Sequence, residues 1–322
     1  MTRLKILFVN MLYDYGDPRR GYGLELIAYD TLHRMGHQLV PFHYDVLMAE
    51  YGREKMNEML LQTAIKEKPD CMFVSLSENQ LDPEVIHQIS FNTDTITFNW
   101  CADDHWRLGY TLAWAPHFNW MVTTSAAAVP VYHQAGYSNV IKSQWGCNPA
   151  IHQKLNLPKI YDVTFIGMPH GNRVEMLQAL VDAGFNVHVW GAGWATGRVS
   201  IGEMVRIFNQ TKINLNFSKA SVADILQIKA RDFEVPGCGG LLMTGYNDEL
   251  SEYYEFGKEV VTYRDQSELI EKIRYYLTHE EERDRIAEAG YNRAVRDHSY
   301  NRRFDQIFRE MGLYGSDRGG LG

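Results

Sequence analysis

The sequence predicts an α/β fold organised as two domains. Short apolar runs alternate with helix-length amphipathic segments along most of the chain, a pattern typical of parallel strands joined by helices. The 322 residues correspond to two domains of ordinary size. A segment of weak periodicity between Pro149 and Pro158 interrupts the alternation and indicates the linker between the domains.

The first β-α-β unit comprises a strand at residues 4–10, a helix at residues 24–35 and a strand at residues 38–42. Parallel units bind ligands beyond the carboxyl ends of their strands, so we expect the loop at residues 11–23 to contact a substrate. The loop carries Gly21 and Gly23, but Leu26 stands where a dinucleotide-binding fingerprint needs its third glycine. We therefore expect no nicotinamide cofactor.

A strand at residues 95–99 leads directly to Asp103, Asp104 and His105. Asp and His are among the side chains that most often act as general acids and bases, which makes these three side chains the candidate catalytic residues. Either aspartate could instead cap the helix expected at residues 106–114, and His105 could be a packed or solvated side chain. The remaining elements expected in this domain are helices at residues 55–66, 83–89 and 129–135 and strands at residues 71–75, 120–124 and 140–144.

The second domain begins with a strand, a loop that contains Gly167, and a helix that starts at Arg173. The free N–H groups of a helix N-terminus favour an anion, and Arg173 adds a full positive charge. The segment therefore suits a phosphate group, with an ordinary strand-to-helix turn as the alternative. Strands at residues 186–190 and 213–217 and a helix at residues 202–210 follow.

The segment at residues 229–244 combines cations, a carboxylate and glycines before a short apolar strand. Arg231 offers forked donors suited to a diphosphate, and Lys229 adds a second charge. Glu234 can accept hydrogen bonds from two ribose hydroxyls, and Gly239 and Gly240 allow close approach of the backbone to a ligand. In the alternative interpretation the glycines only form a turn and Glu234 is solvated.

The chain resembles the spore-maturation-protein (CgeB-like) glycosyltransferases, which have two-domain GT-B architecture. The motifs that carry the resemblance are Arg231-Asp-Phe-Glu234, Gly237-Cys-Gly-Gly240, Glu259-Val-Val-Thr-Tyr263, Glu268-Leu269, Ile286-Ala287, Asn99-Trp-Cys-Ala-Asp-Asp-His-Trp106 and Ser143-Gln-Trp-Gly-Cys-Asn148. The resemblance implies two facing Rossmann-like domains with a deep interdomain cleft. It also implies metal-independent transfer of a hexose-type sugar from a nucleotide-diphosphate donor to a hydroxyl acceptor on a glycan, a protein or a small molecule.

The sequence departs from wider two-domain transferases in one respect. Many of them carry a Glu-x7-Glu pair that contacts the donor sugar and the ribose, and Glu234 matches the second glutamate. Leu226 stands at the first position, with Asp224 as a displaced candidate, so the pair does not indicate a retaining mechanism. The adjacent aspartates at 103 and 104 do not form the Asp-x-Asp metal motif of single-domain transferases, and we expect no metal ion.

We expect residues 1–152 to form the acceptor-binding domain and residues 153–299 the nucleotide-sugar-binding domain. A helix at residues 300–312 would return to the first domain, and residues 313–322 would form a flexible tail. Two alternatives to a transferase stay open: a nucleotide-sugar epimerase of the same architecture, which needs no acceptor, and a non-catalytic nucleotide-sugar-binding protein.

Composition restricts the partners and the location. The formal net charge of -8 argues against nucleic acid. The four widely spaced cysteines are expected to be buried free thiols, and no apolar run reaches the length of a membrane span. These features predict a cytoplasmic protein.

Overall fold

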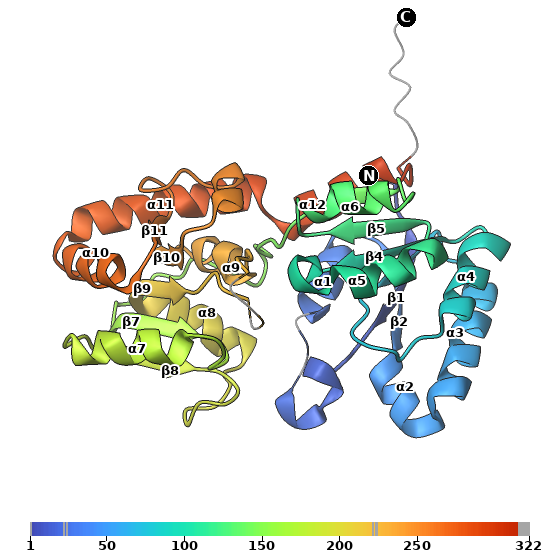
Figure 1. Ribbon diagram of the computed structural model, residues 1–322, viewed down its shortest axis with the longest axis horizontal. Helices are drawn as coiled ribbons and strands as arrows, with labels where there is room; N and C mark the ends of the chain where they lie inside the picture. Colours follow the sequence, from blue (N-terminus) through green and yellow to red (C-terminus); the bar gives the residue numbers. More distant parts are fainter. Residues whose placement is uncertain (1, 22, 24, 221, 223–224, 315–322) are drawn as a thin grey trace, which may run out of the picture. The chain divides into compact units, whose positions relative to one another are not determined.

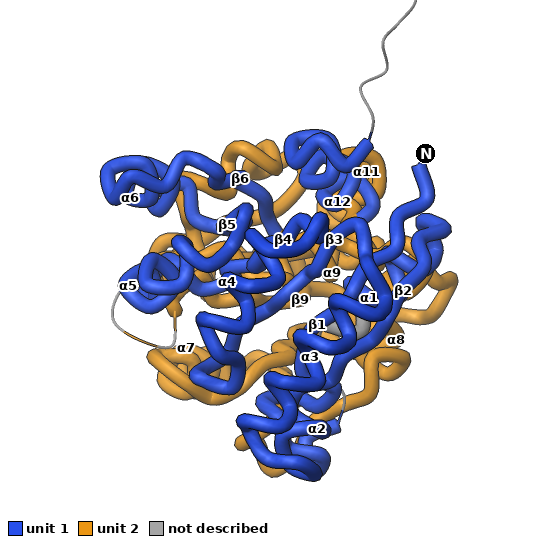
Figure 2. Tube along the Cα trace, turned by 90° about the vertical axis from the view of Figure 1, so that its right-hand side faces the viewer, with its two compact units in different colours: residues 1–144, 301–322 blue, residues 145–300 orange. Residues whose placement is uncertain are grey.

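A computed structural model describes residues 2–21, 23, 25–220, 222 and 225–314. The tail expected at residues 315–322 and the displaced candidate Asp224 lie outside the described residues. The chain divides into two compact units, coloured separately in Figure 2. Unit 1 comprises residues 1–144 and 301–322, and unit 2 comprises residues 145–300.

Unit 1 is built on a six-stranded parallel sheet in the order β2-β1-β3-β4-β5-β6 (Figure 1). Its strands are β1 (Lys5–Asn10), β2 (Gln38–His43), β3 (Cys71–Val74), β4 (Ile96–Cys101), β5 (Trp120–Thr123) and β6 (Val140–Lys142). Its helices are α1 (Glu25–Arg34), α2 (Tyr44–Tyr51), α3 (Arg53–Glu67), α4 (Pro83–Asn92), α5 (Asp104–Trp114), α6 (Ala128–Gln134) and α12 (Tyr300–Glu310), with short 3-10 turns at η1 (Asp14–Gly16), η2 (Pro18–Arg20) and η3 (Ala115–His117). Helix α2 follows β2 directly, where no helix was predicted.

Alternation along the strands of unit 1 gives the sheet two apolar faces. Leu7 and Val9 of β1 belong to a cluster with Met56 and Leu60 of α3. Residues between them point to the opposite face, where rings from distant segments pack together. The ring of Phe304 from α12 lies 5.8 Å from that of Phe73, and Phe308 lies 6.2 Å from Phe98. The terminal helix therefore completes the core of unit 1.

Unit 2 contains a five-stranded parallel sheet in the order β11-β10-β9-β7-β8. Its strands are β7 (Tyr161–Ile166), β8 (Val187–Trp190), β9 (Thr211–Asn216), β10 (Leu242–Gly245) and β11 (Val261–Tyr263). Its helices are α7 (Arg173–Asp182), α8 (Ile201–Gln210), α9 (Arg231–Gly237), α10 (Gln266–Thr278) and α11 (Glu280–Asp297), with a 3-10 turn at η4 (Asp248–Glu252).

The two faces of this sheet are covered by different helices. Val163 and Phe165 of β7 pack in a cluster with residues of α7 and α10. Ile166, on the opposite side of the same strand, belongs to a second cluster with α8 and α9. Helix α8 begins with a capping box between Ser200 and Glu203, which satisfies free N–H groups of its first turn.

Each sheet reverses its strand order next to its first strand. In unit 1, β2 lies on one side of β1 and β3 lies on the other, and in unit 2, β8 and β9 flank β7 in the same way. The loops that leave such neighbouring strands diverge to opposite faces and open a crevice at the carboxyl edge of the sheet, where parallel α/β proteins bind ligands. Ligand sites are therefore expected at the loops after β1 and β3 and at the loops after β7 and β9.

Candidate active site

The reversal in unit 2 brings together the predicted cations of that unit. Arg173 is the first residue of α7, after the loop that leaves β7, and Arg231 is the first residue of α9, after the loop that leaves β9. The Arg231 Nε–H donates to the carbonyl of Ile166, the last residue of β7, over 3.2 Å. The same guanidinium donates through Nη1 to the carboxylate of Glu234. Arg231 thus connects the ends of two elements that are distant in sequence.

Arg173 is buried beside this position, with 7% of its surface exposed. Its Nη1 donates to the Met168 carbonyl and to His170 Nε2, each over 3.0 Å, and its guanidinium lies 5.4 Å from the centre of the Phe165 ring. Burial, and then the positive charge of Arg231, lower the pKa of Arg173 to about 10. The two arginines therefore repel each other in a partly desolvated site.

His170 adds a neutral donor to the cluster. Because Arg173 can only donate, His170 Nε2 must accept, and the neutral imidazole carries its hydrogen on Nδ1. This Nδ1 is buried and has no hydrogen-bond partner among the described residues. Burial, Arg173 and Lys229 lower the pKa of His170 to about 4, so the ring is neutral at pH 7. An N–H group without a partner next to several cations suits an anionic ligand.

A buried carboxylate fixes Lys229 at the same edge. Asp232 accepts from the backbone N–H of Lys229 over 2.8 Å, and from Thr244 Oγ1 and Asn216 Nδ2, each over 2.8 Å. Burial raises the pKa of Asp232, and these donors compensate part of that cost. Lys229 Nζ donates to the side chain of Gln227 over 2.7 Å. Asp232 was not predicted as a site residue. Through these hydrogen bonds it holds the loop before α9 in place.

Glu234 is fully buried, with 0% of its surface exposed, so the alternative of a solvated glutamate is wrong. One carboxylate oxygen, Oε2, accepts from Arg231. The other, Oε1, lies 3.8 Å from His152 Nε2, and both of these atoms lack a hydrogen-bond partner among the described residues. Glu234 thus keeps one acceptor oxygen, Oε1, that no described residue engages.

The predicted glycines fall into two groups. Gly167 follows β7 at the carboxyl edge, where its carbonyl accepts from Trp194 Nε1 over 2.7 Å. Gly239 and Gly240 follow α9 and precede β10, at the opposite edge of the sheet. A Cβ on Gly240 would lie 2.7 Å from Asn214 Nδ2, and one on Gly239 would lie 2.8 Å from the Lys154 side chain. Their donor-binding role is therefore corrected to packing between α9 and its neighbours.

In unit 1 the three candidate acid/base residues have different surroundings. Asp103 occupies the N-cap position of α5, but its side chain makes no capping hydrogen bond. Asp104 is buried, where its carboxylate accepts from Thr111 Oγ1 over 2.6 Å and from the Tyr132 hydroxyl over 3.1 Å. Burial raises the pKa of Asp104. Asp103 and His105 are half-buried, and both ring nitrogens of His105 are buried, so Asp103 is the more exposed aspartate of the pair.

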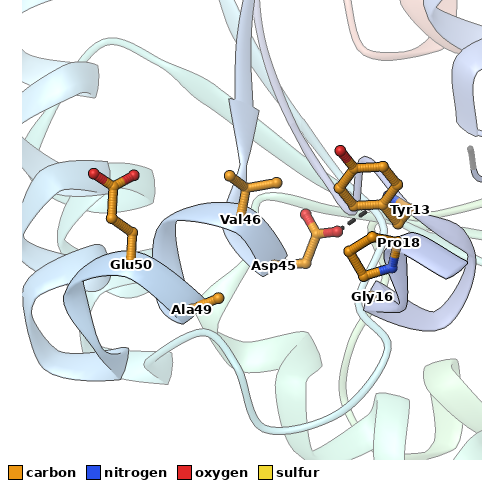
Figure 3. A pocket seen from close by; sticks show the side chains of 7 residues that line it. All are labelled: Tyr13, Gly16, Pro18, Asp45, Val46, Ala49 and Glu50. Atoms are coloured by element: carbon orange, nitrogen blue, oxygen red, sulfur yellow. Dashed lines mark hydrogen bonds between the residues drawn. The ribbon is translucent and has the colours of Figure 1, made fainter.

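A pocket of about 350 Å³ opens between the loop after β1 and helix α2. Figure 3 shows the side chains that line it, which are Tyr13, Gly16, Pro18, Asp45, Val46, Ala49 and Glu50. Asp45 accepts from the backbone N–H groups of Leu12 and Tyr13 over 2.9 and 3.1 Å, which ties the loop to the helix. The pocket combines an aromatic ring, an aliphatic wall and two carboxylates, a lining suited to a small hydroxylated molecule.

Within the part of the chain that the structure describes, no group of three or more His, Cys, Asp or Glu side chains is arranged to hold a metal ion. None of the described helices is long and apolar enough to cross a membrane.

Comparisons with known proteins agree with this architecture. Residues 173–309 match the family described as "Glycosyl transferase-like". The chain is 23% identical over 229 residues to the spore protein CgeB of Bacillus subtilis (strain 168), an alignment that covers 63% of this chain and 71% of that protein. The resemblance to CgeB-like proteins is thereby confirmed.

Solved structures of low sequence identity share the fold. The Anabaena protein Alr3699/HepE, in complex with UDP and glucose, is 14% identical with a TM-score of 0.65, and the alignment covers 97% of this chain and 100% of that one. Sucrose-phosphate synthase from Thermosynechococcus elongatus is 11% identical with a TM-score of 0.68 over 97% and 100% of the two chains. The predicted α/β fold of the GT-B type and the predicted enzyme class, a glycosyltransferase, are both confirmed.

Two histidines that lie beside the candidate residues Arg173 and Glu234 were not predicted. His170 lies in the Gly167-Met-Pro-His170 loop, and its position shortly before Arg173 was an available signal. His152 lies between the two prolines taken as linker boundaries, and nothing in its local sequence indicates a contact with Glu234. The structure assigns residues 145–160 to unit 2, where this segment packs against α9.

The depressed pKa of His170 predicts a response to anions. As pH falls from about 6.5 to about 4, an unfolded chain takes up a proton at this position before the folded protein does, so the free energy of unfolding decreases over that window. Pyrophosphate at the cluster would offset the charges of Arg173 and Lys229 and raise the pKa of His170. An NMR pH titration of the histidine ring protons, with and without pyrophosphate, measures this. His188 of β8 is the internal control, and a His170 that titrates near 6.5 in both conditions contradicts the expectation.

Proposed function

We propose that the protein transfers a sugar from a nucleotide-diphosphate donor, bound by unit 2, to a hydroxyl group of an acceptor, bound by unit 1, without a metal ion. The observation that carries the proposal is the cluster of Arg173, Lys229 and Arg231 at the strand-order reversal of unit 2. The charges of Arg231 and Lys229 act on Arg173 and His170 respectively, which supports one shared anion site. A diphosphate supplies the negative charge that such a cluster lacks.

The donor's diphosphate would contact the three cations and the Nδ1–H of His170. When the bond between the sugar and the diphosphate breaks, negative charge develops on the leaving oxygen. Fixed cations in a partly desolvated site stabilise that charge, which is the task that a divalent ion performs in metal-dependent transferases. The backbone at Gly167 lies next to this cluster and can approach the phosphate closely. The Anabaena relative of this fold was solved with UDP-glucose, which supports a nucleotide sugar as the donor class here.

Glu234 is proposed to bind the ribose. Its position three residues after Arg231 lies one helical turn from that cation, and its Oε2, which accepts from Arg231, becomes available to the ribose when a diphosphate engages the same guanidinium. A nucleotide whose diphosphate contacts Arg231 would thus bring its ribose hydroxyls toward α9.

The acceptor is proposed to bind in the pocket of unit 1, with Asp103 as the base that takes the hydroxyl proton. The pocket lies at the loop after β1, next to the strand-order reversal of that sheet. A binding site for a second substrate favours a transferase over an epimerase, which acts on the donor alone, and a partly exposed Asp103 favours an enzyme over a binding protein. The cysteines at 71, 101, 147 and 238 are free and buried, which supports the cytoplasm as the location.

Neutralising a cation of the cluster should weaken nucleotide binding. Each charge-assisted hydrogen bond contributes about 1.5–3 kcal/mol, so Arg173→Gln and Lys229→Gln should each raise the Kd of UDP, ADP or GDP by roughly 10- to 150-fold. Isothermal titration calorimetry measures the change. Arg206→Gln, an exposed arginine of α8, is the matched control. Unchanged Kd values in both cluster variants would remove the proposed diphosphate site.

Filling the pocket of unit 1 should affect the acceptor and leave the donor unaffected. Ala49→Trp places a large ring at the pocket wall, so we expect the KM for the acceptor to rise by about tenfold or more while the Kd of the nucleotide stays constant. Steady-state transfer to a panel of mono- and disaccharides, with hydrolysis of the donor as a parallel readout, tests this. Tyr51→Trp, on an exposed part of α2, controls for added bulk. Equal acceptor KM in the two variants contradicts the assignment.

The two aspartates should behave differently. Asp103→Asn removes the proposed base and should lower kcat by about 10²- to 10⁴-fold with an unchanged nucleotide Kd. Asp104→Asn alters a buried carboxylate held by Thr111 and Tyr132, so its main effect should be a lower melting temperature. Paired measurements of kcat, nucleotide Kd and melting temperature separate the two roles. Full turnover by Asp103→Asn would eliminate Asp103 as the base.

A further inference from the structure

A buried histidine faces the carboxylate that the proposed function assigns to the ribose. His152 is 1% exposed and Glu234 is 0% exposed. His152 Nε2 and Glu234 Oε1 lie 3.8 Å apart, and both lack a hydrogen-bond partner among the described residues. Two buried polar atoms of complementary kind that stop just short of a hydrogen bond are costly for a folded protein, which calls for an explanation in function.

The hydrogen bonds of His152 place the proton of its neutral imidazole on Nε2, the nitrogen that faces Glu234. The backbone N–H of Asn148 donates to His152 Nδ1 over 2.9 Å, so Nδ1 must carry a lone pair. Burial lowers the pKa of His152, and the ring is neutral at pH 7. A neutral imidazole that accepts at Nδ1 carries its hydrogen on Nε2, and Nε2 is the atom that faces Glu234 Oε1. The imidazole therefore presents a donor to an available acceptor.

The segment that carries His152 is locked against α9. The backbone of Cys147 pairs with that of Ser299 in an isolated parallel β-bridge. The backbone N–H of Cys147 donates to the His298 carbonyl over 3.0 Å. A Cβ on Gly237, at the end of α9, would lie 2.6 Å from the Cβ of Cys147 and 3.4 Å from that of His152. This close approach of the backbone holds the imidazole at a fixed distance from the helix turn that bears Glu234.

A bound diphosphate would change the hydrogen bonds that Arg231 makes. In the structure it donates to the Ile166 carbonyl and to Glu234 Oε2. A diphosphate at the cation cluster competes with Glu234 for the same guanidinium. Glu234 would then lose the partner that neutralises it while it is still buried, and a buried carboxylate needs another donor.

We propose that His152 is the positioning residue of the donor site, and this inference rests on the proposed nucleotide donor. When the diphosphate engages Arg231, the His152 Nε2–H donates to Glu234, which keeps the carboxylate ionised and oriented toward the two ribose hydroxyls. The specificity of the site for a ribonucleotide then depends on a residue that does not itself touch the nucleotide.

The test compares ribonucleotides with nucleotides that lack the hydroxyls. The probes are UDP, ADP and GDP, each paired with its 2′,3′-dideoxy counterpart, and the readout is the ratio of the two Kd values by calorimetry. In the wild-type protein we expect the ribonucleotide of the recognised base to bind at least tenfold more tightly. His152→Phe keeps an aromatic ring but removes the donor, so the ratio should fall to about threefold or less. His152→Gln, whose Nε2 can donate from a similar place, should restore most of the ratio.

His298→Phe is the matched control for loss of a buried histidine in unit 2. His298 is 4% exposed and contacts the Tyr253 carbonyl through Nε2, so its replacement tests general destabilisation. If the ratio of the dideoxynucleotide Kd to the ribonucleotide Kd is the same in His152→Phe, in His298→Phe and in the wild type, the role of His152 is overturned. The proposed nucleotide site is not affected by that outcome. Nucleotides that bind with no preference for ribose overturn the roles of Glu234 and His152 together. Failure of every diphosphate to bind the wild-type protein overturns the proposed function as well.

A second measurement does not depend on the stability of a variant. In ¹⁵N-labelled wild-type protein, His152 should show a protonated Nε2 and an unprotonated Nδ1, and the Nε2 proton should shift downfield when the preferred nucleotide binds. An unprotonated Nε2, or a proton resonance that does not move at saturating nucleotide, overturns the inference.

Discussion

The reversal of strand order beside β7 is the constraint on which the proposed donor site depends. In a parallel sheet every strand ends at the same edge, and the reversal sends the chain from β7 to β8 on one side and to β9 on the other. Arg173 and Arg231, which lie 58 positions apart, therefore meet at one point. Packing of Phe165 and Ile166 on opposite faces of β7 fixes that strand, and Arg231 is anchored to its last carbonyl.

Arg173 and Arg231 were predictable because each begins the helix that follows a strand, and Lys229 lies two positions before Arg231. Apolar runs identified the strands, and the position after a parallel strand indicates the ligand edge whatever the strand order. The same reasoning excludes Gly239 and Gly240 from the ligand edge. Both glycines precede β10, so they lie at the edge of the sheet opposite to the cations. Helix α2 was missed because it follows β2 without a break, so the sequence indicated only the loop side of the pocket, at residues 11–23.

The burial of Glu234 could not be predicted from its own neighbourhood. The side chain is enclosed by Arg231 on its own helix and by His152, which comes from a segment more than 80 positions earlier. Contacts of this kind depend on how the connection between the units packs against α9, and hydrophobic periodicity carries no information about it. The prolines at 149 and 158 indicated an irregular segment, and irregular backbone can still be closely packed when its N–H and carbonyl groups find partners, as those of Cys147 and Asn148 do.

The two proposed substrate sites differ in charge, and this difference can direct the donor to unit 2 and the acceptor to unit 1. The site in unit 2 is lined by Arg173, Lys229 and Arg231, whereas the pocket of unit 1 is lined by Asp45 and Glu50. A diphosphate is attracted to the cations of the first site and repelled by the carboxylates of the second, and both effects favour its binding to unit 2. An acceptor that binds beside two carboxylates is favoured if it is neutral or cationic and disfavoured if it carries phosphate or carboxylate groups. The arrangement therefore limits competition of a highly charged donor for the acceptor pocket.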